Sequence, residues 1–66
     1  MEITLNGVAT ALPDAATVDQ LLAQAGLAER RVAVEVEGAI VPRSAHATHV
    51  LNPGDRVEIV HALGGG

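Results

Sequence analysis

The sequence predicts an α+β fold in which one mixed sheet curls around a single helix. Three features support this prediction: an alternating hairpin around Asn6-Gly7, one amphipathic helical pattern that begins at Thr17, and several short alternating segments after Val32. A chain of 66 residues has room for one small core, so the apolar stripes of all these elements must pack against one another.

The hairpin comes first. Residues 1–5 and 8–12 alternate between apolar and polar or small side chains, and Asn6-Gly7 lies between them. Asn-Gly is the preferred pair for a two-residue type I′ turn because both positions need a positive φ. Such a turn gives one almost wholly apolar face through these pairs: Leu5 with Val8, Ile3 with Thr10 and Met1 with Leu12.

The helix is predicted from its cap and its spacing. Thr17 can serve as N-cap, and Gln20, three residues later, can complete a capping box. Gly26 fits the left-handed position that closes a helix, and Leu27 can fold back on the last turn. The apolar residues at spacings i, i+3, i+4 and i+7 form one stripe: Val18, Leu21, Leu22 and Ala25.

The second half of the chain supplies the remaining strands. Residues 32–37 alternate strictly, Gly38 turns the chain into a short strand at residues 39–41, and residues 43–50 read as a loop with one helical turn. Asn52-Pro53-Gly54-Asp55 suits a type II turn that begins the final strand at Val57. The arrangement that buries every stripe is the ubiquitin-like β-grasp, with the final strand central and parallel to the first.

The composition excludes several classes of function. The chain has no cysteine, so it offers no disulfide, thiolate metal cluster or cysteine nucleophile, and it has no aromatic side chain on which bases could stack. A net charge of −4 disfavours nucleic acids and anionic membranes and favours a partner with a basic surface. No segment approaches the roughly 20 apolar residues of a membrane span, and no leader pattern opens the sequence. We therefore expect a cytoplasmic protein that binds neither nucleic acid nor membrane.

The sequence closes on Gly64-Gly65-Gly66. Glycine packs nothing and loses the most entropy on ordering, so such a run provides reach and narrowness rather than stability. A terminal carboxylate on Gly66 is ionised at neutral pH and could attack an electrophile such as a nucleotide phosphorus. We expect one domain, residues 1–66, with a flexible tail at residues 64–66. A frayed end or a cloning remnant is the alternative.

Several segments together resemble the ThiS family of sulfur-carrier proteins in thiamine biosynthesis, end to end. The segments are Asn6-Gly7, Thr17-Val18, Leu21-Leu22, Val32-Ala33-Val34-Glu35, Gly38, Ile40-Val41-Pro42-Arg43, Gly54-Asp55, Val57-Glu58-Ile59-Val60 and Gly65-Gly66. The most specific of them are Ile40-Val41-Pro42-Arg43 and the closing diglycine. Two positions depart from the family pattern: Glu37, where many members have Asn, and His46, near which many have an aromatic residue.

The resemblance implies a protein co-substrate rather than an enzyme, with no cofactor of its own. A ThiF-like adenylating enzyme would use ATP to convert the Gly66 carboxylate to an acyl-adenylate. Sulfur drawn from cysteine through a desulfurase would then displace AMP and leave a thiocarboxylate. A ThiG-like thiazole synthase would take that sulfur into the thiazole ring.

A docking surface is expected beside the tail. Val60 and Ala62 should lie on the sheet face away from the helix, where they either bind the activating enzyme or simply pack on the sheet. Glu58 shares that face, with Glu35 and Glu37, as an acidic rim that either steers a partner or only solubilises the sheet. The partner-binding set is therefore Glu58, Val60, Ala62, Gly64, Gly65 and Gly66.

Other polar residues are expected to have ordinary roles. His46 and His49, three apart, could be metal ligands, but no cysteine and no obvious third ligand lie nearby, so we expect a solvated loop and no metal. His61 is expected to be an edge residue, and a partner contact is its alternative. Arg43 is expected to be a surface charge paired with an acid, or a partner contact.

Three functions therefore remain open. The leading one is the thiamine sulfur carrier. The second is the small subunit of molybdopterin synthase, which uses the same chemistry for a different acceptor. The third is a β-grasp interaction module with an inert tail.

Overall fold

The computed structural model describes residues 1–61, which form five strands, one α-helix and one 3₁₀ turn. The elements in chain order are β1 (Glu2–Leu5), β2 (Val8–Ala11), α1 (Val18–Gln24), β3 (Val32–Val36), β4 (Ala39–Val41), η1 (Arg43–Ala45) and β5 (Arg56–His61). The single helical turn expected within residues 43–50 is therefore present, as η1. Among the described residues, no helix is long and apolar enough to cross a bilayer.

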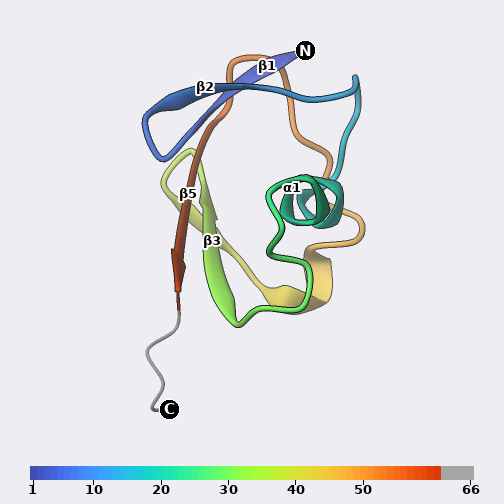
Figure 1. Ribbon diagram of the computed structural model, residues 1–66, viewed down its shortest axis with the longest axis vertical. Coiled ribbons are helices and arrows are strands. Elements are labelled where there is room, and N and C mark those ends of the chain that lie inside the picture. Colours follow the sequence, from blue (N-terminus) through green and yellow to red (C-terminus); the bar gives the residue numbers. More distant parts are fainter. Residues whose placement is uncertain (62–66) are drawn as a thin grey trace.

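One mixed sheet carries the fold. Its strand order is β2-β1-β5-β3-β4, so β5 is central, parallel to β1 and antiparallel to β3. The helix α1 lies against one face of this sheet (Figure 1). The central, parallel placement of the final strand and the β-grasp arrangement are both confirmed.

The two hairpin turns use left-handed backbone. Asn6 and Gly7 have φ values of 48° and 83°, and Glu37 and Gly38 have 50° and 82°. The predicted register holds, with Ile3 opposite Thr10 and Leu5 opposite Val8. These turns fix the pairing within β1–β2 and β3–β4 through local chemistry.

The apolar face of the first hairpin is smaller than predicted. Val8 was expected on that face, but 65% of its surface is exposed. It begins β2, which is an edge strand, and the tip of this hairpin lies away from α1 (Figure 1). None of the described elements therefore covers Val8, and this expectation was wrong.

The helix α1 begins at a complete capping box. The Thr17 side chain accepts from the Gln20 amide at 3.2 Å, and the Gln20 side chain accepts from the Thr17 amide at 2.8 Å. Carbonyl groups of the following loop satisfy the next two free amides: Val18 N–H donates to His49 at 3.0 Å and Asp19 N–H donates to His46 at 2.9 Å. The start of α1 is thereby joined to the loop that precedes β5.

The end of α1 differs from the predicted stripe at one position. Ala25 is exposed and serves as the C-cap. Gly26 turns the backbone with φ 77°, and Leu27 N–H donates to the Leu22 carbonyl at 2.7 Å. Leu27 is half-buried and packs against the core, as expected for a residue that folds back on the last turn, whereas Ala25 does not join the buried stripe.

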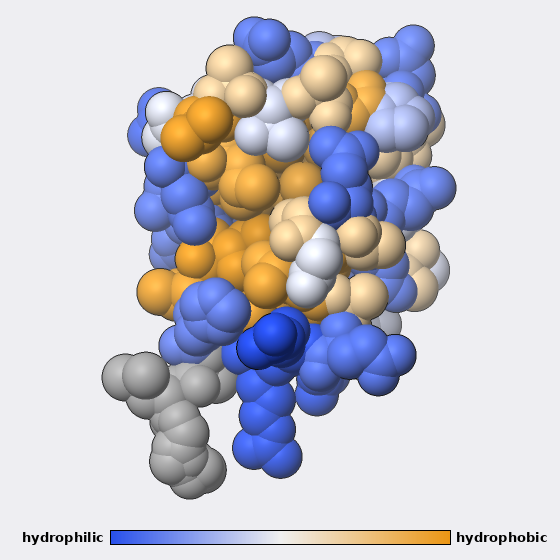
Figure 2. All heavy atoms as spheres, viewed as in Figure 1, coloured by the Kyte–Doolittle hydropathy of each residue, from blue (hydrophilic) through white to orange (hydrophobic). Residues whose placement is uncertain are grey.

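The core lies between α1 and the sheet. Figure 2 shows apolar residues across the middle of the molecule, with hydrophilic residues around them. Three core residues, Leu12, Ala16 and Leu51, come from loops rather than from a regular stripe. The buried apolar cluster consists of Ile3, Leu12, Ala16, Val18, Leu21, Leu22, Val34, Val36, Val41, Leu51, Val57 and Ile59.

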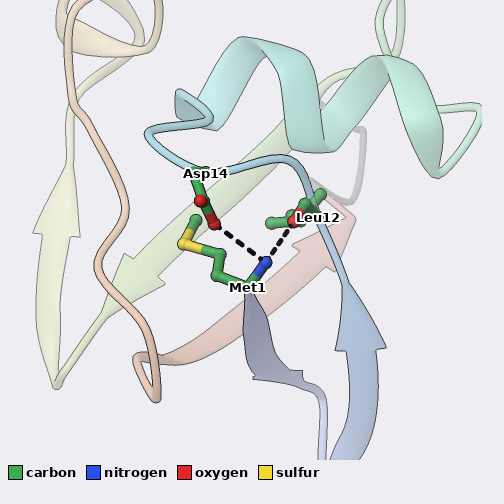
Figure 3. A network of polar contacts seen from close by, with 3 residues as sticks. All are labelled: Met1, Leu12 and Asp14. Atoms are coloured by element: carbon green, nitrogen blue, oxygen red, sulfur yellow. Dashed lines mark hydrogen bonds and ion pairs between the residues drawn. The ribbon is translucent and has the colours of Figure 1, made fainter.

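The first residue is tied to the loop that leads to α1. The Met1 ammonium donates to the Leu12 carbonyl at 2.7 Å and to Asp14 Oδ1 at 3.1 Å (Figure 3). The Asp14 side chain is 94% exposed, so this ion pair contributes little to stability. The bond to Leu12 extends the β1–β2 pairing by one position.

The exposed loop before α1 contains a strained position, Ala15, with φ 62°. A non-glycine residue in this region costs about 1–2 kcal/mol, and glycine removes most of that cost. We expect Ala15→Gly to raise the free energy of unfolding by roughly 0.5–1 kcal/mol in chemical denaturation. The matched control is Ala23→Gly on the exposed side of α1. This change should lower the free energy of unfolding by about 1 kcal/mol. If Ala15→Gly lowered the free energy of unfolding as Ala23→Gly does, the backbone of Ala15 would not be strained.

Candidate functional site

The candidate site begins on the sheet face that α1 does not cover. Glu58 and Val60 of β5 are both exposed, and Val60 keeps 63% of its surface accessible. In the β3–β5 register, Glu35 lies opposite Glu58 and Ala33 lies opposite Val60. Glu58 and Val60 therefore lie where they were predicted, on the open face of the central strand.

A second exposed apolar residue extends this surface. Ile40 of β4 lies opposite Glu35 and is 65% exposed. Its neighbour Val41 is buried, so the alternation of residues 39–41 already indicates that Ile40 points outward. Ile40 was not among the residues predicted for the site. We call the set Ala33, Glu35, Ile40, Glu58 and Val60 the outer-face patch.

The acidic rim of the patch is smaller than expected. Glu35 and Glu58 are direct cross-strand neighbours of like charge, an arrangement that disfavours folding. Glu37 does not join them, because it lies in the β3–β4 turn and its carboxylate accepts the amide of Arg56, the first residue of β5, at 2.6 Å. Within residues 1–61, the carboxylates of the patch that form no hydrogen bond or ion pair are those of Glu35 and Glu58.

An asparagine fixes β5 beneath the patch. Asn6 Nδ2 donates to the Ile59 carbonyl at 3.2 Å, and Asn6 Oδ1 accepts from the Ile59 amide at 2.8 Å. The Asn6 side chain thus continues the hydrogen bonding to β5 beyond Leu5, where β1 ends. From the sequence Asn6 is predicted only as a turn residue, because a contact to a residue 53 positions away leaves no local signal.

The predicted tail lies outside the described residues. Ala62, Gly64, Gly65 and Gly66, the other members of the predicted site, belong to residues 62–66, and so does Leu63. The described part of β5 ends at His61, which is exposed and lies opposite Val32. His61 thus lies at the exposed end of the central strand and not on an edge strand, and a partner contact at this residue stays a prediction.

Two expectations about the loop after β4 were wrong. His46 is buried, with 5% of its surface exposed, and its Nε2 lies 3.0 Å from the Val41 carbonyl. It is a structural residue rather than part of a solvated loop, because its backbone also receives the Asp19 amide of α1. Arg43 is exposed and forms no ion pair with any residue from 1 to 61, so the expected pairing with an acid is absent there. In the same range, no group of three or more potential metal ligands is found.

A family model for the ThiS family matches residues 1–66. The chain belongs to the ThiS family. The resemblance identified from the sequence is thus confirmed over the whole chain.

Solved structures agree with this assignment. A crystal structure of a thiamine biosynthesis protein (ThiS) from Geobacter metallireducens superposes with a TM-score of 0.86 at 30% identity, covering all of both chains. A solution structure of a thiamine biosynthesis protein from the same organism gives 0.79 at 30% identity and covers 88% of that protein. The β-grasp fold of this ThiS-family chain is therefore shared with these proteins.

Two curated relatives are longer proteins. The chain is 41% identical to a thiazole synthase of Paramagnetospirillum magneticum and 39% identical to one of Magnetococcus marinus, in both cases over 66 residues. It spans only 20% of the length of each. The similarity therefore concerns one region of those proteins.

The bridge from Asn6 to β5 is testable in this ThiS-family chain. We expect Asn6→Gly, which keeps the left-handed turn, to lower the free energy of unfolding by about 1–3 kcal/mol through loss of two side-chain hydrogen bonds. Hydrogen exchange of the Ile59 amide should accelerate in the same variant. Asn52→Gly is the matched control, because no hydrogen bond of the Asn52 side chain is formed within residues 1–61. Equal losses in both variants would show that glycine entropy, not the bridge, accounts for the effect.

Proposed function

We propose that this chain is a sulfur carrier in thiamine biosynthesis. The carboxylate of Gly66 is the acceptor, and the loaded form is a thiocarboxylate. The observation that carries the proposal is the ThiS-family match over residues 1–66, which includes the closing glycines. The chain is then a recycled protein co-substrate and not an enzyme.

The proposed chemistry needs two steps because a carboxylate has no good leaving group. In the first, a carboxylate oxygen of Gly66 attacks the α-phosphorus of ATP in a ThiF-like enzyme, and pyrophosphate leaves. In the second, the outer sulfur of a persulfide on the cysteine desulfurase attacks the acyl carbon, and AMP leaves. A thiol of a partner protein then reduces the resulting acyl disulfide, which leaves the thiocarboxylate on Gly66 and a disulfide on the partner. The absence of cysteine from the sequence fits this scheme, since the sulfur is held on the backbone terminus.

The relatives favour thiazole synthase as the acceptor. Two proteins named thiazole synthase contain a region similar to this chain and are about five times its length, since the chain covers 20% of each. A carrier joined to its acceptor in one polypeptide gains a high effective concentration. This supports a ThiG-like acceptor for the present chain over molybdopterin synthase.

The outer-face patch has the features expected of a surface to which a partner protein binds. Ile40 and Val60 are exposed branched residues on a rigid sheet, and Glu35 and Glu58 lie between them. Apolar residues flanked by charge are typical of a protein interface, and the acids would attract a basic surface. Glu58 and Val60 of this patch belong to β5, the strand that directly precedes residues 62–66 in the sequence.

Deletion of Gly66 tests the carrier proposal. The chain is incubated with ATP, a ThiF-like enzyme and a sulfur source, and its intact mass is measured. We expect the full chain to gain the mass of one oxygen-to-sulfur exchange and the truncated chain to gain none. Thermal unfolding should be the same for both, because Gly66 has no side chain to pack. Equal loading of the truncated chain would rule out the carrier chemistry, and loading of neither would favour the inert interaction module.

The acceptor is tested separately with the loaded chain. Sulfur transfer to a ThiG-like thiazole synthase is compared with transfer to the large subunit of molybdopterin synthase. We expect transfer to the first and little to the second. If sulfur were transferred to molybdopterin synthase and not to thiazole synthase, the proposed acceptor would be wrong, but the proposed carrier chemistry would still hold.

Charge reversal at Glu58 tests the docking surface. We expect Glu58→Lys to slow association with the adenylating enzyme several-fold at low salt, with a smaller effect as salt rises. The same change should raise the unfolding free energy by up to roughly 1 kcal/mol, because it removes the repulsion from Glu35. Glu29→Lys, an exposed change of equal charge outside the sheet, is the control. Equal slowing in both variants would show a net-charge effect and contradict docking through the patch.

A further inference from the structure

A small open pocket lies at the end of the sheet where β5 finishes. It is formed by α1, the loop before β3, β3 itself, and the loop after β4, and its volume is about 50 Å³. Its wall includes Val32, which pairs with His61, the last residue of β5. Hydrophilic side chains gather at this end of the molecule (Figure 2). One water needs roughly 10–15 Å³, so the pocket has room for several waters or one small polyatomic ion.

Two arginines line this pocket. Arg30 and Arg43 are half of the four basic side chains in a chain of net charge −4. Within residues 1–61, neither guanidinium forms an ion pair or a side-chain hydrogen bond. A guanidinium presents donors in a planar fork that matches the oxygens of a carboxylate or a phosphate.

The buried ring of His46 supplies an acceptor. Its Nε2 must donate to the Val41 carbonyl, because a carbonyl oxygen can only accept, so the neutral ring carries its lone pair on Nδ1. Nδ1 has no partner among the described residues, yet no buried side-chain nitrogen or oxygen there is left unsatisfied. Nδ1 therefore keeps some accessible surface, and His46 is one of the residues that line the pocket.

Asp19 supplies a second acceptor. It also lines the pocket, and its carboxylate forms no hydrogen bond or ion pair within residues 1–61. A pocket with two guanidiniums, one carboxylate and one imidazole acceptor suits a ligand that accepts several hydrogen bonds and also donates one. Sulfate has no donor at neutral pH, whereas hydrogen phosphate has a hydroxyl.

We propose that this pocket binds a phosphate group that carries a proton. Arg30 and Arg43 donate to its oxygens, and its hydroxyl donates to Asp19 or to Nδ1 of His46. The group is inorganic phosphate or the terminal phosphate of a small monoester. This site is separate from the outer-face patch, and it does not depend on the proposed sulfur chemistry.

The test is an NMR titration of the full chain with inorganic phosphate at constant ionic strength. We expect amide shifts at residues 28–32, 43–46 and 19 that saturate in phosphate, and binding of sulfate about tenfold weaker or more, as the loss of one charge-assisted hydrogen bond implies. Titration with AMP distinguishes the two sources, since a monoester that shifts the same amides shows that the site accepts an esterified phosphate. If inorganic phosphate shifts these amides and AMP does not, the site accepts only the free ion.

Matched variants separate a built site from general attraction. Arg43→Gln and Arg30→Gln should each weaken phosphate binding about tenfold or more. Arg31→Gln removes the same charge from an exposed neighbour that does not line the pocket and should leave binding nearly unchanged. Asp19→Asn should reduce the preference for phosphate over sulfate. Equal binding of the two anions, equal effects of the three arginine variants, or no saturating shifts at the pocket would overturn the proposal.

Discussion

The fold depends on the parallel pairing of β5 with β1. This pairing joins the N-terminal half, β1, β2 and α1, to the C-terminal half, β3, β4 and β5, and it involves residues more than 50 positions apart. The ladder itself is short, with two Cα pairs, Thr4 with Arg56 and Leu5 with Val57. Backbone bonds from Thr4 to Asp55 and from Asn6 to Val57, both at 2.9 Å, complete it. The Asn6 side chain then carries the pairing on to Ile59.

The central position of β5 gives its two faces different roles. Val57 and Ile59 are buried against the core under α1, so the strand cannot shift its register without exposing them. Glu58 and Val60, on the other face, are held rigidly yet remain accessible. A carrier needs this combination, because a partner that handles the chain end requires a fixed surface from which to locate it. The proposed docking surface thus follows from the same pairing that holds the fold together.

Local signals made most of the fold predictable from the sequence. The Asn6-Gly7 turn, the capping box from Thr17 to Gln20 and the alternation of β3 each depend on residues within a few positions of one another. The predictions of burial that proved wrong depend on which distant segments pack over a residue. Val8 is exposed because no element lies over its edge strand, and His46 is buried because the loop around it packs against the start of α1.

The candidate site was predictable in part for the same reason. The outward positions of Glu58 and Val60 follow from alternation along one strand. Ile40 follows from the same rule but belongs to a three-residue strand, where the pattern is short. The pocket at Arg30 and Arg43 joins segments that only the folded chain brings together, so no spacing in the sequence indicates it.

The outer-face patch also combines two features that disfavour stability. Glu35 and Glu58 repel each other across β3 and β5, and Ile40 and Val60 expose branched apolar surface. Replacing either glutamate with a neutral residue would remove the repulsion between them. Sequences tend to keep such local conflicts where function requires them. A basic partner surface with apolar residues at its centre would offset both costs at once. The energetics of the free chain and the proposed docking therefore point to the same face.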